Sequence, residues 1–196
     1  ASADVDIELR AAVTALSAYG SAVIPTLSKV LSNSLEDPSI RRAVARVLGR
    51  LGTTESVDVI TRYLEEPDEE LRARMYKALA RAVKGRRLLL TDRKPVEQAL
   101  ESEIERAYVT LTQAELLGLT HGPNADTPRS GEPAARALLA SAMVEKVDQI
   151  ERRIFLLLAV LFPDADIEQI HAGIHDAAAQ DAPRRRANAV ELLDNP

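Results

Sequence analysis

The sequence predicts an all-α protein, built as an α-solenoid of antiparallel helix pairs with a long helical hairpin inserted. Three observations support this fold class: an aliphatic composition, a repeated helical pattern near the amino terminus, and two long heptad-like segments further along. Hydrophobic residues make up 46% of the 196 residues, whereas aromatic residues make up only 3% and Trp is absent. The core is therefore expected to be aliphatic, and a core rich in Ala and Leu favours helices because both are strong helix formers.

A helical pattern recurs along the first 83 residues. Three dipeptides of an aliphatic residue and an arginine stand 31 residues apart: Leu9-Arg10, Ile40-Arg41 and Leu71-Arg72. Each opens a segment whose apolar residues are spaced by three and four, as on one helix face. Between them lies a second set offset by 33 residues, in which Ile24, Leu27, Val30 and Leu31 correspond to Val57, Ile60, Tyr63 and Leu64. One such helix pair cannot bury its apolar face alone, so we expect stacked pairs in a right-handed array.

Helix boundaries follow from a few local signals. Asp37-Pro38 and Glu66-Pro67 each place a capping acid before a proline, which is tolerated in the first turn of a helix. Gly20 and Gly52 separate the first helix of a pair from the second, as carboxyl-terminal caps would. The repeating unit is therefore helix–turn–helix, a little over 30 residues long.

This period resembles that of HEAT repeats, most closely in the stretch from Asp37 to Gly49. The resemblance implies an ARM-type superhelix of helix pairs that binds other proteins. A non-repetitive helical bundle is the alternative.

A basic cluster follows the repeats. Five cations and one acid lie between residues 84 and 94, whereas the whole chain carries a net charge of −5. The cations are Lys84, Arg86, Arg87, Arg93 and Lys94. They could contact anionic lipid headgroups, a partner protein or a nucleotide phosphate. The simpler interpretation is a solvated turn whose basic residues face the carboxyl-terminal end of a helix.

Two long segments with matching periodicity predict an antiparallel helical hairpin. Their apolar seam residues are Val96, Leu100, Ile104, Ala107, Leu111, Ala114 and Gly118 in the first arm, and Leu139, Met143, Val147, Ile150, Ile154, Leu157 and Leu161 in the second. The residues between the arms, 121–133, contain three prolines and two glycines and predict a loop. The apolar run from Ile154 to Phe162 is expected to be buried on two sides, with Ile154 deep in the seam and Lys146 on the outer face.

A further helix pair is predicted after Pro163. Ile167, Ile170 and Ile174 mark one helix, and Asp181-Ala182-Pro183 opens another, in which Arg186 takes the place of Arg41 and Arg72. We therefore divide one continuous domain into repeats (1–83), a basic turn plus hairpin (84–162) and a final pair (163–196). The chain is expected to be a piece of a longer protein.

The carboxyl-terminal third resembles a known family. The stretches Arg152–Leu158, Phe162–Asp164 and Arg186–Asn195 are similar to the HEAT-repeat region of bacterial ADP/ATP-translocase-like membrane proteins. In that family a multi-spanning, nucleotide-transporter-like portion comes first and the HEAT region follows on the soluble side. The resemblance implies a transporter-associated, cytoplasmic module at the membrane face, held there through the parent chain. It brings no catalytic residues with it.

No catalytic, cofactor or metal site is predicted from the motifs. His171, His175 and Glu168 could share one helix face, but two histidines without a third clear ligand more simply lie on the surface beside the isoleucines. The carboxylates at residues 65–70 and 101–105 are most simply solvated faces or helix amino termini, because no histidine or serine accompanies them in a catalytic spacing. Cysteine is absent, which excludes disulfides and thiolate chemistry within this sequence.

Three function classes are compatible with these features. The one we favour is a non-enzymatic scaffold or regulatory module that binds a protein partner, either another part of its parent chain or a peptide. The alternatives are a HEAT-like enzyme of the DNA glycosylase or bilin lyase type, and a free-standing peptide-binding adaptor. The sequence pI of about 5.3 and the absence of Trp argue against a nucleic-acid partner.

Overall fold

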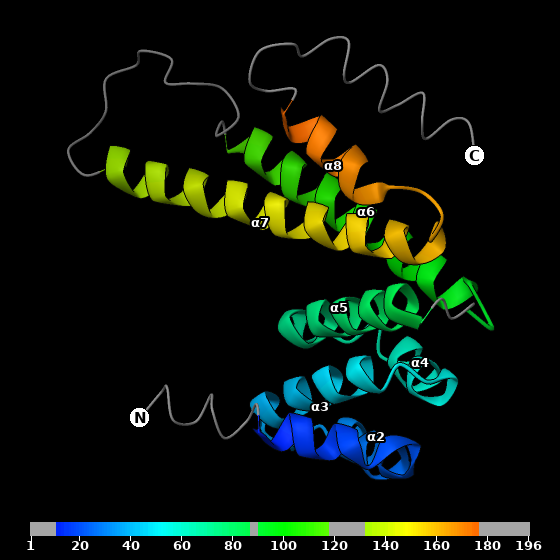
Figure 1. Ribbon diagram of the computed structural model, residues 1–196. Coiled ribbons are helices and arrows are strands. Elements are labelled where there is room, and N and C mark those ends of the chain that lie inside the picture. Colours follow the sequence, from blue (N-terminus) through cyan, green and yellow to red (C-terminus); the bar gives the residue numbers. More distant parts are fainter. Residues whose placement is uncertain (1–10, 87–89, 118–131, 177–196) are drawn as a thin grey trace.

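The structure is a computed structural model that describes residues 11–86, 90–117 and 132–176 (Figure 1). Over these ranges the chain is helical and contains no strand, which confirms the predicted all-α class. A helix at Ala11–Ala18 comes first. The elements that follow are η1 (Gly20–Val23), α2 (Ile24–Ser32), α3 (Pro38–Leu51), α4 (Thr54–Thr61), α5 (Glu69–Arg86), α6 (Lys94–Leu116), α7 (Glu132–Leu161) and α8 (Ile167–Asp176).

The helices form a stack (Figure 1). Helix α3 packs against α5, and α5 packs against α7. Helix α2 packs on α3 and α4, and α4 packs on α3 and α5. The hairpin of α6 and α7 thus continues the stack from α5, and α8 packs on α7. One aliphatic core runs from Val13 to Leu161 through these helices, as the composition predicts.

Local signals explain where the repeat helices begin and end. Asp37 accepts a hydrogen bond from the backbone N–H of Ser39 at 2.7 Å, with Pro38 in the first turn of α3, as predicted. Gly20 and Gly52 have φ values of 64° and 54°, a left-handed conformation that glycine adopts without steric cost. The predicted cap of α5 is wrong by two residues. Asp68, rather than Glu66, accepts the backbone N–H of Glu70 at 2.9 Å.

The two arms of the hairpin are antiparallel, as predicted. Arg93, which precedes α6, donates to the backbone carbonyl of Leu161 at the end of α7, and Glu103 further along α6 accepts from Arg153 in the carboxyl-terminal third of α7. These pairs have nearly the same residue-number sum, because the helices run in opposite directions. In Figure 1 the amino-terminal part of α7 extends beyond α6.

The predicted seam on α6 is rotated in the structure. The buried residues of this helix are Val96, Ala99, Glu103, Thr110 and Ala114, whereas Ile104 and Leu111 are 38% and 45% exposed. On α7, Ile150, Leu157 and Leu161 are buried as predicted, but Ile154 is only half-buried and Leu139 is 43% exposed. The reason is that α7 packs on α5 as well as on α6, so the contact faces of the hairpin turn toward α5.

The apolar end of α7 is covered on two sides, as predicted. Leu157, Val160 and Leu161 lie in the main core. Phe155, Leu158 and Ala159 pack against Ile167 and Ile170 of α8, in a second, smaller cluster. Helix α8 therefore confirms the first helix of the predicted final pair. The second helix, with Arg186, and nearly all of the predicted loop lie outside the described residues.

No single helix in the described ranges has both the length and the apolar character needed to cross a membrane. Two consecutive helices, Ala11–Ala18 and Gly20–Ser32, reach that length and composition together but are bent by 114°. Val13, Leu27 and Leu31 of this pair are buried in the core.

Candidate functional site

The arginine of the repeated dipeptide is a structural element of each unit. Arg41 donates from Nε and Nη2 to the backbone carbonyl of Leu31, at 3.2 and 3.0 Å. Arg72, at the equivalent position, donates from Nη1 to the carbonyl of Glu66 at 2.7 Å. Each arginine thus satisfies a carbonyl group at or just beyond the end of the preceding helix, where helix carbonyls lack backbone partners. Neither residue is predicted to do this from spacing alone.

Arg72 also reaches a carboxylate that α6 buries. Its Nε donates to Oε1 of Glu103 at 3.0 Å, and Glu103 is fully buried. The same oxygen accepts from Nη1 of Arg106 at 2.8 Å, while Oε2 accepts from Nε of Arg153 at 2.8 Å. Three guanidinium groups from α5, α6 and α7 therefore converge on one carboxylate. The prediction that Glu103 belongs to a solvated face is wrong, because these arginines compensate its burial.

Tyr76 completes the buried cluster. Its hydroxyl lies 3.0 Å from the carbonyl oxygen of Leu64 and 3.3 Å from Oε1 of Glu103. Burial, and next the negative charge of Glu103, raise the pKa of Tyr76 well above that of a free phenol. The hydroxyl therefore keeps its proton at neutral pH and serves as a hydrogen-bond donor.

Two half-exposed carboxylates bind the outer side of these arginines. Glu69 accepts from Nη1 of Arg153 at 2.7 Å, and Glu65 lies 3.4 Å from Nη2 of Arg106. The Glu69 side chain is 44% exposed. The hydrogen bond from Arg153 lowers the pKa of Glu69, although partial burial opposes the shift. The arginine cluster thus favours an anionic group on its solvent side.

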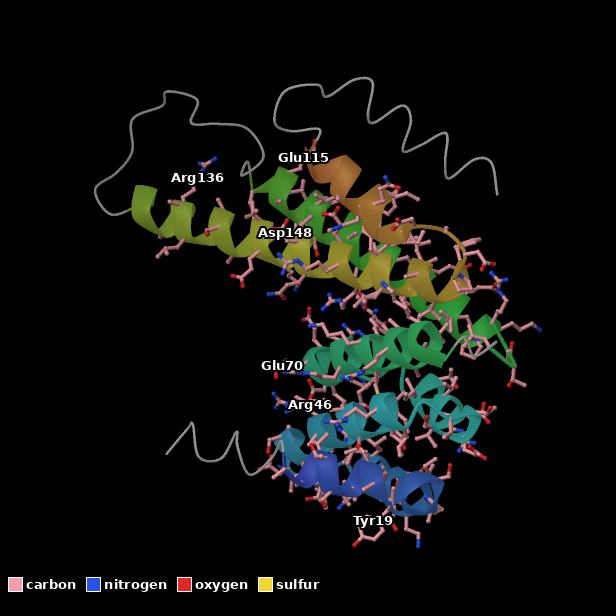
Figure 2. All side chains as sticks on the ribbon, viewed as in Figure 1. Tyr19, Arg46, Glu70, Glu115, Arg136 and Asp148 are labelled. Atoms are coloured by element: carbon pink, nitrogen blue, oxygen red, sulfur yellow. The ribbon has the colours of Figure 1, made fainter. Side chains whose placement is uncertain are left out.

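A pocket of about 570 Å³ opens above this cluster, where the amino-terminal end of α5 meets α6 and α7. Its charged lining residues are Glu69, Arg72, Glu105, Arg106, Lys146 and Arg153. Val109 and Ile150 supply apolar surface. In Figure 2, side chains tipped with nitrogen and oxygen fill the space between α5 and α7, and the labelled Glu70 marks the end of α5 nearest the pocket. The pocket thus combines a cationic floor with walls that are partly polar and partly apolar.

The predicted basic cluster is open to solvent at each of its side chains that the structure describes. Lys84, Arg93 and Lys94 are exposed, and Arg93 also donates to the backbone carbonyl of Leu161 at 3.1 Å. Arg93 also lies 3.7 Å from Glu97 and 5.8 Å from the ring centre of Phe162, and therefore fastens the start of α6 to the end of α7. Arg87 and the side chain of Arg86 lie outside the described residues.

His171 is not the surface histidine that the sequence predicts. It is half-buried, and its ring packs edge-on against Phe155 with the centroids 4.4 Å apart. The side chains of His175 and Glu168 lie outside the described residues. Over the described ranges, no three His, Asp or Glu residues are grouped so that they could hold a metal ion. That no metal is bound remains a prediction.

The sequence signals for the pocket were visible but scattered. The sequence places Arg72 in the repeat and Arg153 in a stretch that resembles a known family, whereas Arg106 belongs to no predicted pattern. The missing signal was the stripe through Val96, Ala99, Glu103, Thr110 and Ala114, which follows helical spacing as well as the predicted seam does. An acid within such a stripe indicates a buried ion pair.

The fold and the arginine contacts define a helical-repeat protein of stacked pairs. A protein-family model described as HEAT repeats matches residues 2–83, which supports a HEAT-repeat region over this part of the chain, as the 31-residue spacing predicts. No curated protein and no solved structure matches the chain. The resemblance to ADP/ATP-translocase-like proteins depends on residues beyond 83, so this match does not reach it.

Proposed function

We propose that the chain is a non-enzymatic protein-interaction module, the cytoplasmic HEAT-repeat part of an ADP/ATP-translocase-like membrane transporter. The observation that carries the interaction role is the match of residues 2–83 to HEAT repeats, because stacked helix pairs of this kind present extended binding surfaces. The packing of α3 on α5 and of α5 on α7 supports this role by extending the stack beyond the matched residues.

The transporter context is supported by the resemblance at Arg152–Leu158 and Phe162–Asp164. In the structure, the first of these stretches belongs to the part of α7 that packs against α5, α6 and α8, and the second follows directly. The resemblance therefore includes residues that organise the stack, and a module of that family would share this arrangement.

Photo-crosslinking in cells tests the role. A photoreactive amino acid at Tyr108, which is 70% exposed on α6, should capture a multi-spanning membrane protein or the membrane-spanning portion of the same polypeptide, identified by mass spectrometry. The same group at the fully buried Met75 is the control and should capture no partner. Crosslinks from Tyr108 only to nucleic acid would contradict the interaction role, and crosslinks only to soluble proteins would contradict the transporter context.

We further propose that Lys84, Arg86, Arg87 and Lys94 face the anionic headgroups of the membrane. The support is the concentration of cations in an acidic chain, together with the exposure of Lys84 and Lys94. Arg93 belongs to the same proposed contact, because its side chain is 53% exposed although it also contacts Leu161 and Phe162. An acidic remaining surface would be repelled by the membrane and so would orient the module.

Vesicle flotation tests this contact. Reversing Lys84, Arg86 and Arg87 to Glu should abolish binding to anionic vesicles at low salt, because each cation near such a surface contributes about 1 kcal/mol. The matched control reverses three exposed arginines elsewhere: Arg62, Arg74 and Arg152. Equal loss in both variants would show that net charge, rather than this cluster, drives binding. No binding by the unchanged protein would also refute the contact.

A further inference from the structure

The pocket above Glu103 has an imbalance of buried charge. Arg72 and Arg153 have side chains that are each only 6% exposed, and the carboxylate buried with them is the single one of Glu103. The charges that offset the excess are all closer to solvent: Glu65 and Glu69 have side chains that are 49% and 44% exposed, and Glu105 is an exposed residue that lines the same pocket. Water screens such outer carboxylates well, whereas it screens the buried guanidinium groups poorly. The floor of the pocket therefore favours an additional anion.

Glu69 shows how a carboxylate is bound at this place. It approaches from the solvent side and accepts a hydrogen bond from Nη1 of Arg153 at 2.7 Å. Arg106 and Lys146 line the same pocket, and the Arg106 side chain is 35% exposed. A carboxylate from another molecule could bind beside Glu69 or take its place. Arginine suits this contact, because its planar guanidinium group matches the geometry of a carboxylate.

The apolar part of the lining indicates what carries the carboxylate. Val109 and Ile150 lie in the wall beside the arginines. Val109 is 56% exposed, so its side chain is available for contact. A pocket of about 570 Å³ has the size of sites that take small ligands or a few side chains. This combination fits a peptide segment in which an acidic residue neighbours an aliphatic one.

We propose that the pocket formed by α5, α6 and α7 binds an acidic side chain of a partner protein, with Arg106, Lys146 and Arg153 contacting its carboxylate. This inference rests on the proposed interaction role and names the chemistry of the partner. Glu69 occupies the site when the partner is absent and competes with it.

The competition by Glu69 can be tested, because a purely structural role of these residues would not change the affinity for an added peptide. The probe is a fluorescent peptide of alternating glutamate and leucine, compared with its glutamine counterpart by fluorescence anisotropy. Glu69→Gln should tighten binding of the glutamate peptide several-fold, because it removes the competing carboxylate. Glu70→Gln is the matched control, since Glu70 neighbours Glu69 but pairs with Arg42 and does not line the pocket. It should leave the affinity unchanged.

A second pair of variants tests the cations without disturbing the core. Lys146→Ala should weaken the glutamate peptide about fivefold, the equivalent of roughly 1 kcal/mol. Arg152→Ala removes the same charge from an exposed position on the same helix, outside the pocket, and should have no such effect. Equal affinity for the glutamate and glutamine peptides, or equal effects of Lys146→Ala and Arg152→Ala, would overturn the proposal.

A competition experiment with inorganic phosphate distinguishes a peptide site from a site for small anions. We expect phosphate to displace the peptide only at concentrations so high that the added salt screens all charge–charge interactions. Complete displacement by equimolar phosphate would show that the pocket takes small anions and would overturn the assignment to a peptide. The interaction role is tested separately, because photo-crosslinking from Tyr108 does not depend on this pocket. If crosslinks to a protein partner persist in Lys146→Ala and the protein shows no selectivity for the glutamate peptide, the proposed role of the pocket is refuted but the interaction role is not.

Discussion

Helix α5 makes two interfaces of opposite character, one with α3 and one with α6 and α7. On the α3 side, Gly49 lets the backbones approach so closely that an added Cβ would lie 2.8 Å from Cα of Ala78. On the α6 and α7 side, Arg72 and Tyr76 of the same helix reach the buried carboxylate of Glu103. The α3 interface is thus closely packed, with an ion pair between Arg42 and the exposed Glu70, whereas the other interface buries a charged cluster.

The difference shows where the regular repeat changes into the long hairpin. A close apolar contact depends on small residues at one crossing, so it can recur in every unit of a stack. The carboxylate of Glu103 instead takes donors from three helices, and shifting any one of them along its axis would break a hydrogen bond. We infer that this cluster fixes the register of the hairpin against α5, as buried polar groups do in some helical assemblies.

The largest expected effect comes from breaking the charged interface. Glu103→Ala leaves Arg72, Arg106 and Arg153 without their shared partner, so the free energy of unfolding should fall by about 3–5 kcal/mol. Glu101→Ala, at an exposed position two residues away on the same helix, should change it by less than about 0.5 kcal/mol. Urea denaturation measures both. Similar stabilities for the two variants would mean that the buried cluster does not hold the hairpin.

Alanine substitutions on the packed faces of α7 should cause the next largest loss in the free energy of unfolding. Ile150 is 1% exposed, so Ile150→Ala should cost about 2–5 kcal/mol. Ile154 is half-buried, and Ile154→Ala should cost less, about 1–2 kcal/mol. The seam predicted from the sequence makes the two positions equivalent. The ratio of the two losses in the free energy of unfolding therefore shows whether α7 packs as the sequence predicts or as in the structure. A larger loss at Ile154 would contradict the packing of α7 on α5.

These two interfaces also differ in how far the sequence predicts them. The repeat helices and their caps follow from local signals, because Asp37, Gly20 and Gly52 act on the backbone within a few residues. The rotation of α6 does not follow from its own sequence, since two overlapping stripes fit helical spacing equally well. The choice between them depends on Arg72 and Arg153, which the fold brings to Glu103 from 31 and 50 residues away.

The candidate site cannot be predicted from the sequence, for the same reason. The sequence shows a cluster of cations that are close together in the chain, such as Arg93 and Lys94. The cations of the pocket come instead from three helices and meet only after the stack has formed. Charge runs are visible in a sequence, whereas charges that converge from distant segments are not.

Breaking the steric interface should have an intermediate effect. Gly49→Ala places a Cβ 2.8 Å from the Ala78 backbone, so α3 and α5 must move apart, at a cost of about 1–3 kcal/mol. Gly173→Ala is the control, because no atom lies within 4 Å of its added Cβ in α8. There the gain in helix propensity should stabilise the protein by up to about 1 kcal/mol. A neutral result at Gly49 would show that the close approach is not required.

The smallest expected effect concerns the outer ion pair between Glu69 and Arg153. Because the pKa of Glu69 is lowered in the folded protein, the pair contributes stability that is fully present above the ordinary glutamate pKa of about 4.5 and is lost as the pH falls through the lower, folded value. The Glu69 side chain is 44% exposed, so solvent screens the pair and the contribution at neutral pH should be below about 1 kcal/mol.

Comparing the unchanged protein with Glu69→Gln across pH isolates this contribution. The unchanged protein should be slightly more stable at pH 6. The difference should shrink as the pH falls below the ordinary glutamate pKa of about 4.5, and it should disappear once the pH lies below the lower pKa of Glu69 in the folded protein. Glu101→Gln, which alters an exposed carboxylate outside the pocket, should give no such pH-dependent difference. A difference between the two proteins that persists unchanged at pH 3 would mean that Glu69 stabilises the fold through packing. The charged interface of α5 would then end at Glu103, and the solvent side of Arg153 would have no electrostatic preference for a carboxylate.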